Sequence, residues 1–279
     1  MKKMILGLVT IVFIVLIAVA AKEVILKSKN ENITITNKVI DEEKILDGSN
    51  INNIDISCYN LNVNLIPSDD NKIRVHISGK IPQKNTDRAY SMLVNSSQGK
   101  ASIEVKWDKT ITVALMKSQQ LDIYIPKVYS SDIFIDASNG DVTAEGFNFQ
   151  NFNVNATSGN IAAKSLKAEN SKIKSSSGYI KLNEFAGNII AKSSSGAINV
   201  QYASFASNVI SLESASGDLK LSIPKDAAFY LKARSSSGKV SCGFPIQVKE
   251  SGKNKLEGAS GEGQNEVILD THSGDIDIQ

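Results

Sequence analysis

Residues 174–180 read KSSSGYI, and residues 192–198 read KSSSGAI. Five further segments share this pattern, in which a Gly follows small polar residues and precedes Val, Ile or Leu by two positions. The aligned glycines are Gly140, Gly159, Gly178, Gly196, Gly217, Gly238 and Gly274. Their spacings are 19, 19, 18, 21, 21 and 36 residues, and Gly261 lies inside the long last interval. A motif that returns at nearly constant spacing indicates a repeat architecture.

The repeat predicts an all-β fold, a β-solenoid of the parallel β-helix type with about seven to eight coils. Gly adopts positive φ without a steric penalty, so a Gly at a fixed place after Ser predicts a sharp corner with positive φ. The apolar residue two positions later is expected to point into the core from the next strand. A period of about 20 residues accommodates two or three short strands per coil, and coils would stack about 4.8 Å apart.

Small polar residues recur directly before the glycines. Stacked on one another, such side chains would form a hydrogen-bonded ladder that satisfies the backbone groups of the corners. The residues expected to form this ladder are Asn139, Ser158, Ser177, Ser195, Ser216 and Ser237.

The chain before the repeats also has the pattern of β structure. Alternating apolar and polar residues over 51–125 predict lead-in strands that cap one end of the solenoid. Within them, the stretch 86–95 is the one segment that also fits a short helix. The polar residues 22–50 are expected to be a stalk or linker, or a lead-in strand. Residues 126–279 hold the repeats, so the whole solenoid domain covers 51–279.

The C-terminal end of the chain carries the last copy of the repeat. Residues 267–279, VILDTHSGDIDIQ, are therefore expected to be the last coil. The long interval before them leaves two interpretations of Gly261, a degenerate copy of the repeat or an inserted loop. Because one repeat cannot bury its apolar face alone, both ends of the stack need caps.

Residues 1–21 are predicted to be a membrane anchor or a signal segment. Lys2 and Lys3 precede an uncharged run from Met4 to Ala21, which as a helix would span about 27 Å, close to the hydrocarbon thickness of a bilayer. This length favours an uncleaved anchor, whereas the small residues 18–20 fit a cleavage site. The predicted location is the cell membrane, single-pass with an extracytoplasmic C-terminal domain, and the alternative is secretion after signal cleavage.

The composition excludes several classes of protein. With 18 Gly, 5 Pro and 42% hydrophobic residues, the chain is neither collagen-like nor a low-complexity sequence. Lys plus Arg number 31 and Asp plus Glu 29, so there is no bulk charge to attract nucleic acid. Cys58 and Cys242 lie far apart without a CxxC pattern, which argues against a zinc or thiol-redox site. Whether these two cysteines pair with each other stays open.

The sequence resembles the bacterial "putative adhesin" β-strand-repeat family, a domain of unknown function found in exported and membrane-anchored proteins. The resemblance rests on the SxSG repeats, on LDIYIPK (121–127) and LKLSIPK (219–225), and on the ending GEGQNEVILDTHSGDIDI (261–278). It covers roughly residues 50–279. It implies a β-solenoid-like fold at the cell surface and supplies no catalytic residues.

Residue types that often carry chemistry are sparse. His76 is expected on the outer face of a strand and His272 at a corner, which suits solvent-exposed positions rather than catalysis. The repeated Ser lacks the strand–turn–helix setting and the His partner of a nucleophile elbow. Asp141, Asp218 and Asp275 follow their glycines, but neutral or basic residues fill this position elsewhere, so no repeating calcium site is expected. We expect no catalytic residue, cofactor or metal ligand.

A weak basic stripe is the remaining candidate site. Lys174, Lys192 and Arg234 each lie four residues before their Gly and would bind anionic wall polymers or surface glycans. The sequence thus favours a non-enzymatic surface protein with an adhesin-like or envelope-scaffold role. One alternative is an extracytoplasmic regulatory module that docks a membrane sensor protein of an envelope-stress system. A second alternative is a carbohydrate-active β-helix enzyme with clustered carboxylates.

Overall fold

The structure is a computed structural model that describes residues 36–83, 90–107, 119–262 and 265–279. The fold described below is that of residues 37–279, which form one compact unit. The hydrophobic helix expected in residues 1–21 lies outside the described residues. Among the residues that are described, none belongs to a helix long and apolar enough to cross a membrane.

The described residues are all-β, as the repeat predicts. The strands of the N-terminal half are β1 (Thr36–Asp47), β2 (Asn53–Cys58), β3 (Asn62–Ser68), β4 (Lys72–Gln83), β5 (Tyr90–Ser97), β6 (Lys100–Trp107), β7 (Gln120–Pro126), β8 (Asp132–Ala137), β9 (Val142–Glu145), β10 (Asn148–Ala156) and β11 (Ile161–Lys164). Those of the C-terminal half are β12 (Lys167–Ser175), β13 (Ile180–Ser193), β14 (Ile198–Tyr202), β15 (Val209–Ser214), β16 (Leu219–Ser222), β17 (Phe229–Ser235), β18 (Val240–Cys242), β19 (Gln247–Gly252), β20 (Lys255–Ser260), β21 (Asn265–Thr271) and β22 (Ile276–Ile278).

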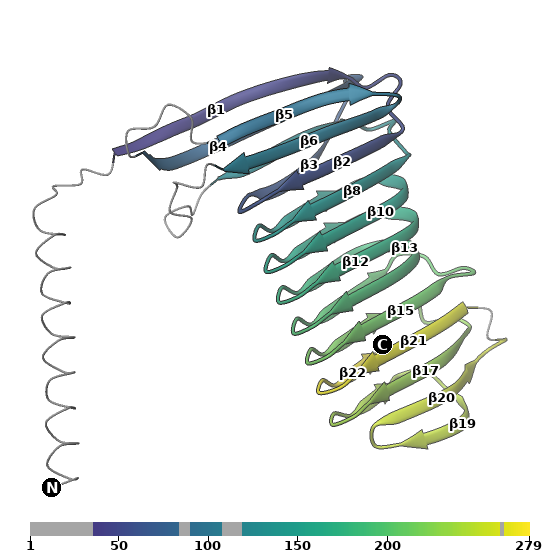
Figure 1. The fold of residues 1–279 in the computed structure, drawn as a ribbon. Coiled ribbons are helices and arrows are strands. Elements are labelled where there is room, and N and C mark those ends of the chain that lie inside the picture. The colour runs from purple at the N-terminus through teal and green to yellow at the C-terminus, as the bar shows by residue number, and fades with distance from the viewer. Residues whose placement is uncertain (1–35, 84–89, 108–118, 263–264) are drawn as a thin grey trace, which may run out of the picture. The chain divides into compact units, whose positions relative to one another are not determined.

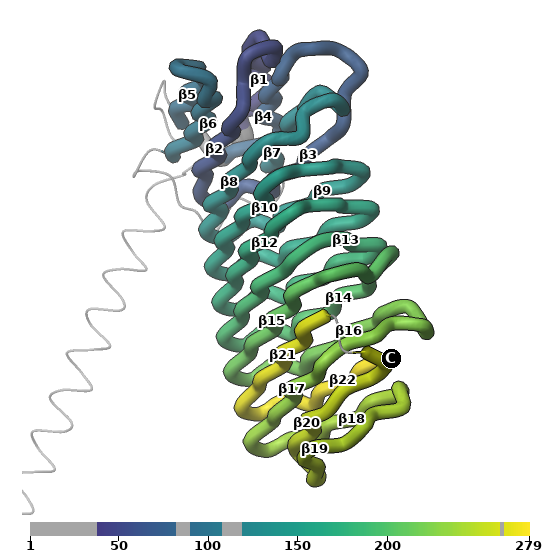
Figure 2. The backbone as a smooth tube through the Cα atoms, turned by 90° about the vertical axis from the view of Figure 1, so that its right-hand side faces the viewer, coloured from purple at the N-terminus to yellow at the C-terminus, as the bar shows by residue number. Residues whose placement is uncertain are grey.

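The strands form two parallel stacks joined at the glycine corners (Figures 1 and 2). Sheet A runs in the order β7-β3-β9-β11-β13-β14-β16-β22-β18. Sheet B runs in the order β6-β2-β8-β10-β12-β13-β15-β21-β17. A strand of sheet B, a corner and the following strand of sheet A make one layer of a solenoid-like stack. The long strand β13 contributes to both sheets.

The core lies between the two sheets. The apolar residue two positions after each corner Gly points inward, which confirms the expectation from the repeat. Ile161, Ile180 and Ile198 lie in register on neighbouring strands and are fully buried. The equivalent Val240 is only half-buried, because β18 is the outermost strand of sheet A. Each layer thus adds one buried side chain to a continuous apolar column.

The corner glycines are required for a reason other than the expected one. None of the seven has positive φ, so the prediction of left-handed corners was wrong. Instead, a Cβ on Gly178 would lie 1.9 Å from the carbonyl oxygen of Gly159, and one on Gly196 equally close to that of Gly178. All seven corners show this contact with the corner below, at 1.6 to 2.1 Å. Stacked backbone occupies the space that a side chain would need.

The hydroxyl ladder lies three residues before five of the seven glycines, not one residue before; Ala137 and Ala156 occupy this place before Gly140 and Gly159. The Ser193 Oγ accepts the N–H of Gly196 at 2.8 Å. The Ser214 Oγ accepts the N–H of Gly217 at 2.8 Å and donates to the Gly196 carbonyl of the neighbouring layer at 3.3 Å. The members of this ladder are Ser175, Ser193, Ser214, Ser235 and Thr271, all buried. The residues directly before the glycines are exposed, and among them only Asn139 donates a side-chain hydrogen bond to a neighbouring layer, to Asn60 Oδ1 at 2.7 Å, so the described residues do not form the ladder predicted there.

Left-handed backbone occurs at the opposite turn of three neighbouring layers. Gly146, Ser165 and Glu184 follow the sheet A strands at equivalent positions, with φ of 76°, 50° and 54°. A Cβ on Gly146 would meet no atom within 4 Å. Because this turn is wide, it tolerates side chains that the tight glycine corner excludes.

The order of the layers departs from the order of the sequence at both ends. Strands β21 and β22 lie between β15/β16 and β17/β18 (Figure 2), so the prediction that residues 267–279 form the last coil was wrong. The hairpin β19–β20 covers the end of sheet B and explains the interval around Gly261 as an insertion. At the other end, β2 and β3 lie between β6/β7 and β8/β9. Each sheet thus has more parallel strands than the seven to eight coils expected.

Antiparallel strands cover the N-terminal end of the stack. Strand β5 pairs with β6, β4 pairs with β7, and β1 pairs with β4. The segment 22–50, expected as a stalk or lead-in strand, therefore includes strand β1 in its described part. The helix considered for residues 86–95 is absent from their described part, since residues 90–97 form β5.

The close contact at the corner makes a prediction about Gly178. Replacing Gly178 by Ala should destabilise the domain by about 3 kcal/mol or more, because Cβ would overlap a backbone carbonyl. Gly146→Ala is the matched control and should cost only about 1 kcal/mol, since its φ is positive but the space is open. Thermal unfolding followed by circular dichroism compares the two. Equal losses at both positions would contradict the stacking explanation.

The ladder predicts different effects for two adjacent serines. Ser193→Ala should cost about 1–3 kcal/mol, because it leaves the buried N–H of Gly196 without an acceptor. Ser194→Ala should change stability by less than about 0.5 kcal/mol, since this side chain is exposed. Ser193→Thr should retain most of the stability, as Thr271 occupies the equivalent place. Denaturant unfolding measures all three, and a larger loss for Ser194→Ala would refute the assignment.

Candidate functional site

Alternation along the strands directs every second side chain of sheet B away from the core. In β12, Ile173 is buried while Lys172 and Lys174 on either side of it are exposed. The parallel register then aligns one exposed residue from each strand into a row, here called the outer row. It consists of Asp136, Asn155, Lys174, Lys192, Glu213, Asp270 and Arg234.

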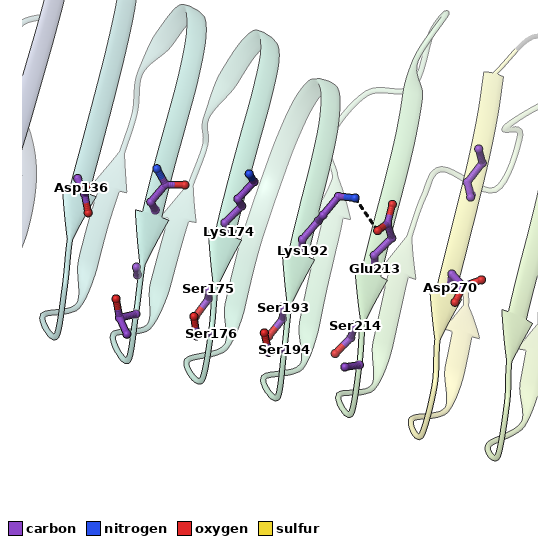
Figure 3. Close-up of a pocket in the computed structure, with 15 residues that line it drawn as sticks. Asp136, Lys174, Ser175, Ser176, Lys192, Ser193, Ser194, Glu213, Ser214 and Asp270 are labelled. Carbon is purple, nitrogen blue, oxygen red and sulfur yellow. Dashed lines mark hydrogen bonds and ion pairs between the residues drawn. The ribbon is translucent and has the colours of Figure 1, made fainter.

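A groove of about 850 Å³ follows the outer row across five strands, β8, β10, β12, β13 and β15, and reaches β21. Its charged lining comes from the outer row between Asp136 and Asp270 (Figure 3). Hydroxyl groups of the corners line the other side, among them those of Thr157, Ser176 and Ser194. The groove is open to solvent and elongated along the stacking direction, so it suits an extended ligand.

The basic residues at the centre of the groove are not equivalent. Lys192 Nζ lies 2.6 Å from Glu213 Oε2, and both side chains are nearly half exposed. Such an ion pair contributes at most about 1 kcal/mol. Lys174 lies in register with Asn155 on one side and Lys192 on the other, and it forms no ion pair with any described residue. Its ammonium is therefore available to an anionic group of a ligand.

Lys172 lies beside the groove without lining it, and the sequence interpretation did not single it out. It lies two residues from Lys174 on the same face of β12, exposed, and forms no ion pair with a described residue. The alternation around Ile173 was the signal that could have revealed it. Three ammonium groups thus gather on β12 and β13.

Arg234 does not continue the basic stripe. Glu213 and Asp270 lie between it and Lys192, because β21 is inserted between β15 and β17. Of the three residues expected to form one stripe, Lys174 and Lys192 are therefore neighbours, and Arg234 is separate from them. Arg234 instead lines a second groove of about 310 Å³ with Lys232 and Lys255. Along the outer row, one basic pair is thus followed by one acidic pair and then by the single Arg234.

Apolar side chains lie beside the outer row. Ile190 of β13 and Val209 of β15 are 40% and 48% exposed. Ser211 pairs with Ile190 on one side and with Ile268 on the other, which places the second isoleucine on the same face. We call Ile190, Val209 and Ile268 the apolar patch. On this face of sheet B, exposed apolar side chains therefore lie next to the charged side chains of the outer row.

The acidic residues that follow the glycines have structural roles. Asp141 Oδ1 accepts the N–H of Asn160 in the next layer at 2.8 Å, and Asp275 Oδ1 accepts that of Lys239 at the same distance. Asp218 Oδ1 likewise accepts the N–H of Asp275 at 2.8 Å. Across the described ranges, no three His, Cys, Asp or Glu side chains are arranged to hold a metal ion.

Neither histidine is among the residues that line the groove, although His272 follows the lining residue Asp270 by two positions. His76 Nε2 is 2.7 Å from Asp41 Oδ1, on the face of β4 that points away from the core. His272 is exposed at a corner, where its N–H donates to the Ser214 carbonyl. Neither histidine is close to the serines of the buried ladder in a way that resembles a nucleophile and its base.

Both cysteines are free thiols in strands at opposite parts of the stack, so they do not pair within the chain. Burial, reinforced by the charge of Asp136, raises the pKa of Cys58 to about 12. Burial also raises the pKa of the half-buried Cys242. A thiol is nucleophilic only as thiolate, so neither is activated at neutral pH.

Three of the solved structures that match this chain come from bacteria. One is named as a putative adhesin from Bacteroides fragilis, with 16% identity, a TM-score of 0.46, and coverage of 87% of this chain and 97% of that one. A putative cell adhesion protein from Clostridium sporogenes has 13% sequence identity and a TM-score of 0.38, and the match covers 86% of this chain and 99% of that one. A putative adhesin from Parabacteroides distasonis has 12% sequence identity and a TM-score of 0.39, and the match covers 86% of this chain and 97% of that one. At these values the likeness carries no information about function. No curated protein matches the chain.

The family comparison covers most of the chain. The Toastrack DUF4097 family matches residues 51–279, from just before β2 to the last residue. The match confirms the family resemblance that the SxSG repeats and the C-terminal element indicated. It includes every layer of the two-sheet stack and the groove on sheet B. The chain therefore belongs to the Toastrack DUF4097 family.

Proposed function

We propose that this protein is a non-enzymatic binding module of the cell surface, with an adhesin-like or envelope-scaffold role. The observation that carries the proposal is the elongated groove across successive layers of sheet B, lined by hydroxyl and charged side chains. The proposed ligand is an anionic linear polymer of the cell wall or a surface glycan, lying along the stack and contacting one outward residue of each layer.

The spacing of the layers supports an extended ligand. Neighbouring strands are about 4.8 Å apart, so residues in one row recur at this interval along the stack. A linear polymer that follows the row meets Lys174 and Lys192 in succession, with Lys172 beside them. Each contact is weak because the groove is open to water. Several weak contacts to one polymer nevertheless add up to useful avidity.

The distribution of charge supports selectivity rather than bulk attraction. The domain is nearly neutral overall, and the acidic pair Glu213 and Asp270 interrupts the basic residues. A uniformly anionic polymer would be attracted at the lysines and repelled at the acidic pair. The preferred polymer would therefore carry its anionic groups at intervals, with neutral units between them.

The proposed location is the outer face of the cell membrane. Residues 1–21 would anchor the chain as a single-pass segment, and release after cleavage would make the protein secreted. In either case the wall polymer would be accessible to the outer row.

A second candidate function is an extracytoplasmic regulatory module that docks a membrane sensor protein. The specific observation in its favour is the apolar patch, since exposed hydrocarbon beside charge is typical of protein interfaces. A carbohydrate-active enzyme is less well supported. The side chains brought together in the groove include Glu213 and Asp270, but Glu213 is occupied by its ion pair with Lys192.

Binding to isolated cell walls tests the proposal. The full-length chain in mild detergent should sediment with walls at low salt and be released as the ionic strength rises, because exposed charge contacts are screened. The double variant Lys174→Gln/Lys192→Gln should bind about fivefold more weakly, since two exposed charge contacts are lost.

The matched control is Lys181→Gln, which removes an exposed lysine from the outer face of sheet A. It should bind like the unchanged chain. Equal binding of the double variant and the control would refute the assignment to sheet B. An unchanged chain that sediments at no salt concentration would refute polymer binding and favour the sensor-docking candidate.

A further inference from the structure

The groove on sheet B contains charges of both signs that have no partner within the described part of the chain. Its charged lining, in the order of the strands, is Asp136, Lys174, Lys192, Glu213 and Asp270 (Figure 3). Lys192 and Glu213 form an ion pair at 2.6 Å and so neutralise each other. Asp136, Lys174 and Asp270 form no ion pair with any described residue. The groove therefore presents a carboxylate near each end and one ammonium group between them.

The parallel register sets the distances between these three charges. Asp136 on β8 and Lys174 on β12 are two strands apart, which corresponds to about 10 Å. Lys174 and Asp270 on β21 are three strands apart, which corresponds to about 14 Å. Both separations exceed the length of a direct ion pair, so the three charges do not satisfy one another. A ligand that fills the groove passes all three.

Arg234 does not form an ion pair with Asp270. The two residues are register partners on β17 and β21, but no ion pair joins them within the described ranges. Arg234 lines the second groove together with Lys232 and Lys255, whereas Asp270 lines both grooves. Because the side chain of Asp270 is exposed, its carboxylate is accessible to a ligand in the first groove.

A polymer that carries only anionic groups fits this order of charges poorly. It would be attracted at Lys174 and repelled at Asp136 and Asp270, because like charges repel each other. Neutral units opposite the two carboxylates would remove the repulsion but would leave both carboxylates without a partner. An ammonium group opposite each carboxylate turns both repulsions into attractions. The order of ligand charges that matches the groove is therefore cation, anion, cation.

The other wall of the groove suits the uncharged backbone of such a polymer. Thr157, Ser176 and Ser194 are exposed at successive corners and line the groove. A hydroxyl group both donates and accepts hydrogen bonds, so this wall can contact the hydroxyl groups of a sugar or polyol chain. The charged substituents of the polymer then face the outer row.

We propose that the groove binds a linear polymer that carries ammonium groups as well as anionic groups. An anionic group contacts Lys174, and ammonium groups contact Asp136 and Asp270 on either side of it. In place of some of the neutral units between its anionic groups, the polymer thus carries cationic ones. The inference rests on the proposed function, because it specifies the chemistry of the polymer that the groove binds.

Chemical treatment of isolated cell walls tests the ammonium groups. Acetylation of wall amines removes their positive charge, whereas reductive dimethylation retains it. The full-length chain in mild detergent should bind acetylated walls about fivefold more weakly than untreated walls, because two exposed charge contacts are lost. Dimethylated walls should be bound nearly as well as untreated walls. A site for anionic groups alone predicts no loss on acetylation, since the net negative charge of the walls increases.

Two double variants test the carboxylates from the side of the protein. Asp136→Asn/Asp270→Asn should bind untreated walls about fivefold more weakly and should no longer distinguish them from acetylated walls. Glu169→Gln/Glu266→Gln is the matched control, because it removes two exposed carboxylates of β12 and β21 that do not line the groove. The control should bind untreated walls like the unchanged chain and retain the sensitivity to acetylation. Thermal unfolding establishes that both variants are folded.

The outcomes separate this inference from the proposed function. Equal or stronger binding to acetylated walls would overturn the inference and leave the proposed function standing. Tighter binding by the Asp136/Asp270 double variant would also overturn it, because that result is expected when the carboxylates only repel an anionic polymer. If the unchanged chain does not bind untreated walls, the proposed function fails and the inference fails with it.

Discussion

The contact between stacked corner backbones sets the geometry of the whole stack. The carbonyl oxygen of one corner lies where the next corner's side chain would begin, so only Gly can be placed there. The buried hydroxyl three residues earlier accepts the N–H of this Gly, and in several layers it also reaches the carbonyl of the neighbouring corner. Together these contacts hold successive layers in one register. The core column and the exposed rows both follow from that register.

The same constraint separates the requirements of the fold from those of the surface. Inward positions must be apolar, and the corner must be Gly. The outward side chains of sheet B face solvent, so their only requirement is that they are compatible with water. Within one row they are acidic, amide, basic and acidic again. The charges on the outward face of sheet B can therefore vary from strand to strand without altering the core. The ion pair of Lys192 and Glu213 and the unpaired Lys174 are products of this freedom.

The sequence predicted the repeat, the all-β class, the inward column and the family, because each depends on spacing within one repeat. It did not predict the order of layers. Residues 267–279 look like any other repeat, and nothing local indicates that they stack inside the end of the solenoid. Arg234 was therefore assigned to a stripe that β21 interrupts. The ladder was missed for another reason: SSSG offers three serines, and only the alternation from Ile173 shows that Ser175 points inward.

The inserted C-terminal layer has a consequence for synthesis. A chain synthesised from its N-terminus can stack β8 to β16 as each layer emerges, since these layers are neighbours in sequence. Strands β17 to β20 then emerge before the layer that attaches them to the stack, and they must wait for residues 265–279. A chain that lacks residues 265–279 would therefore leave one edge of β15 and one edge of β16 without a strand partner.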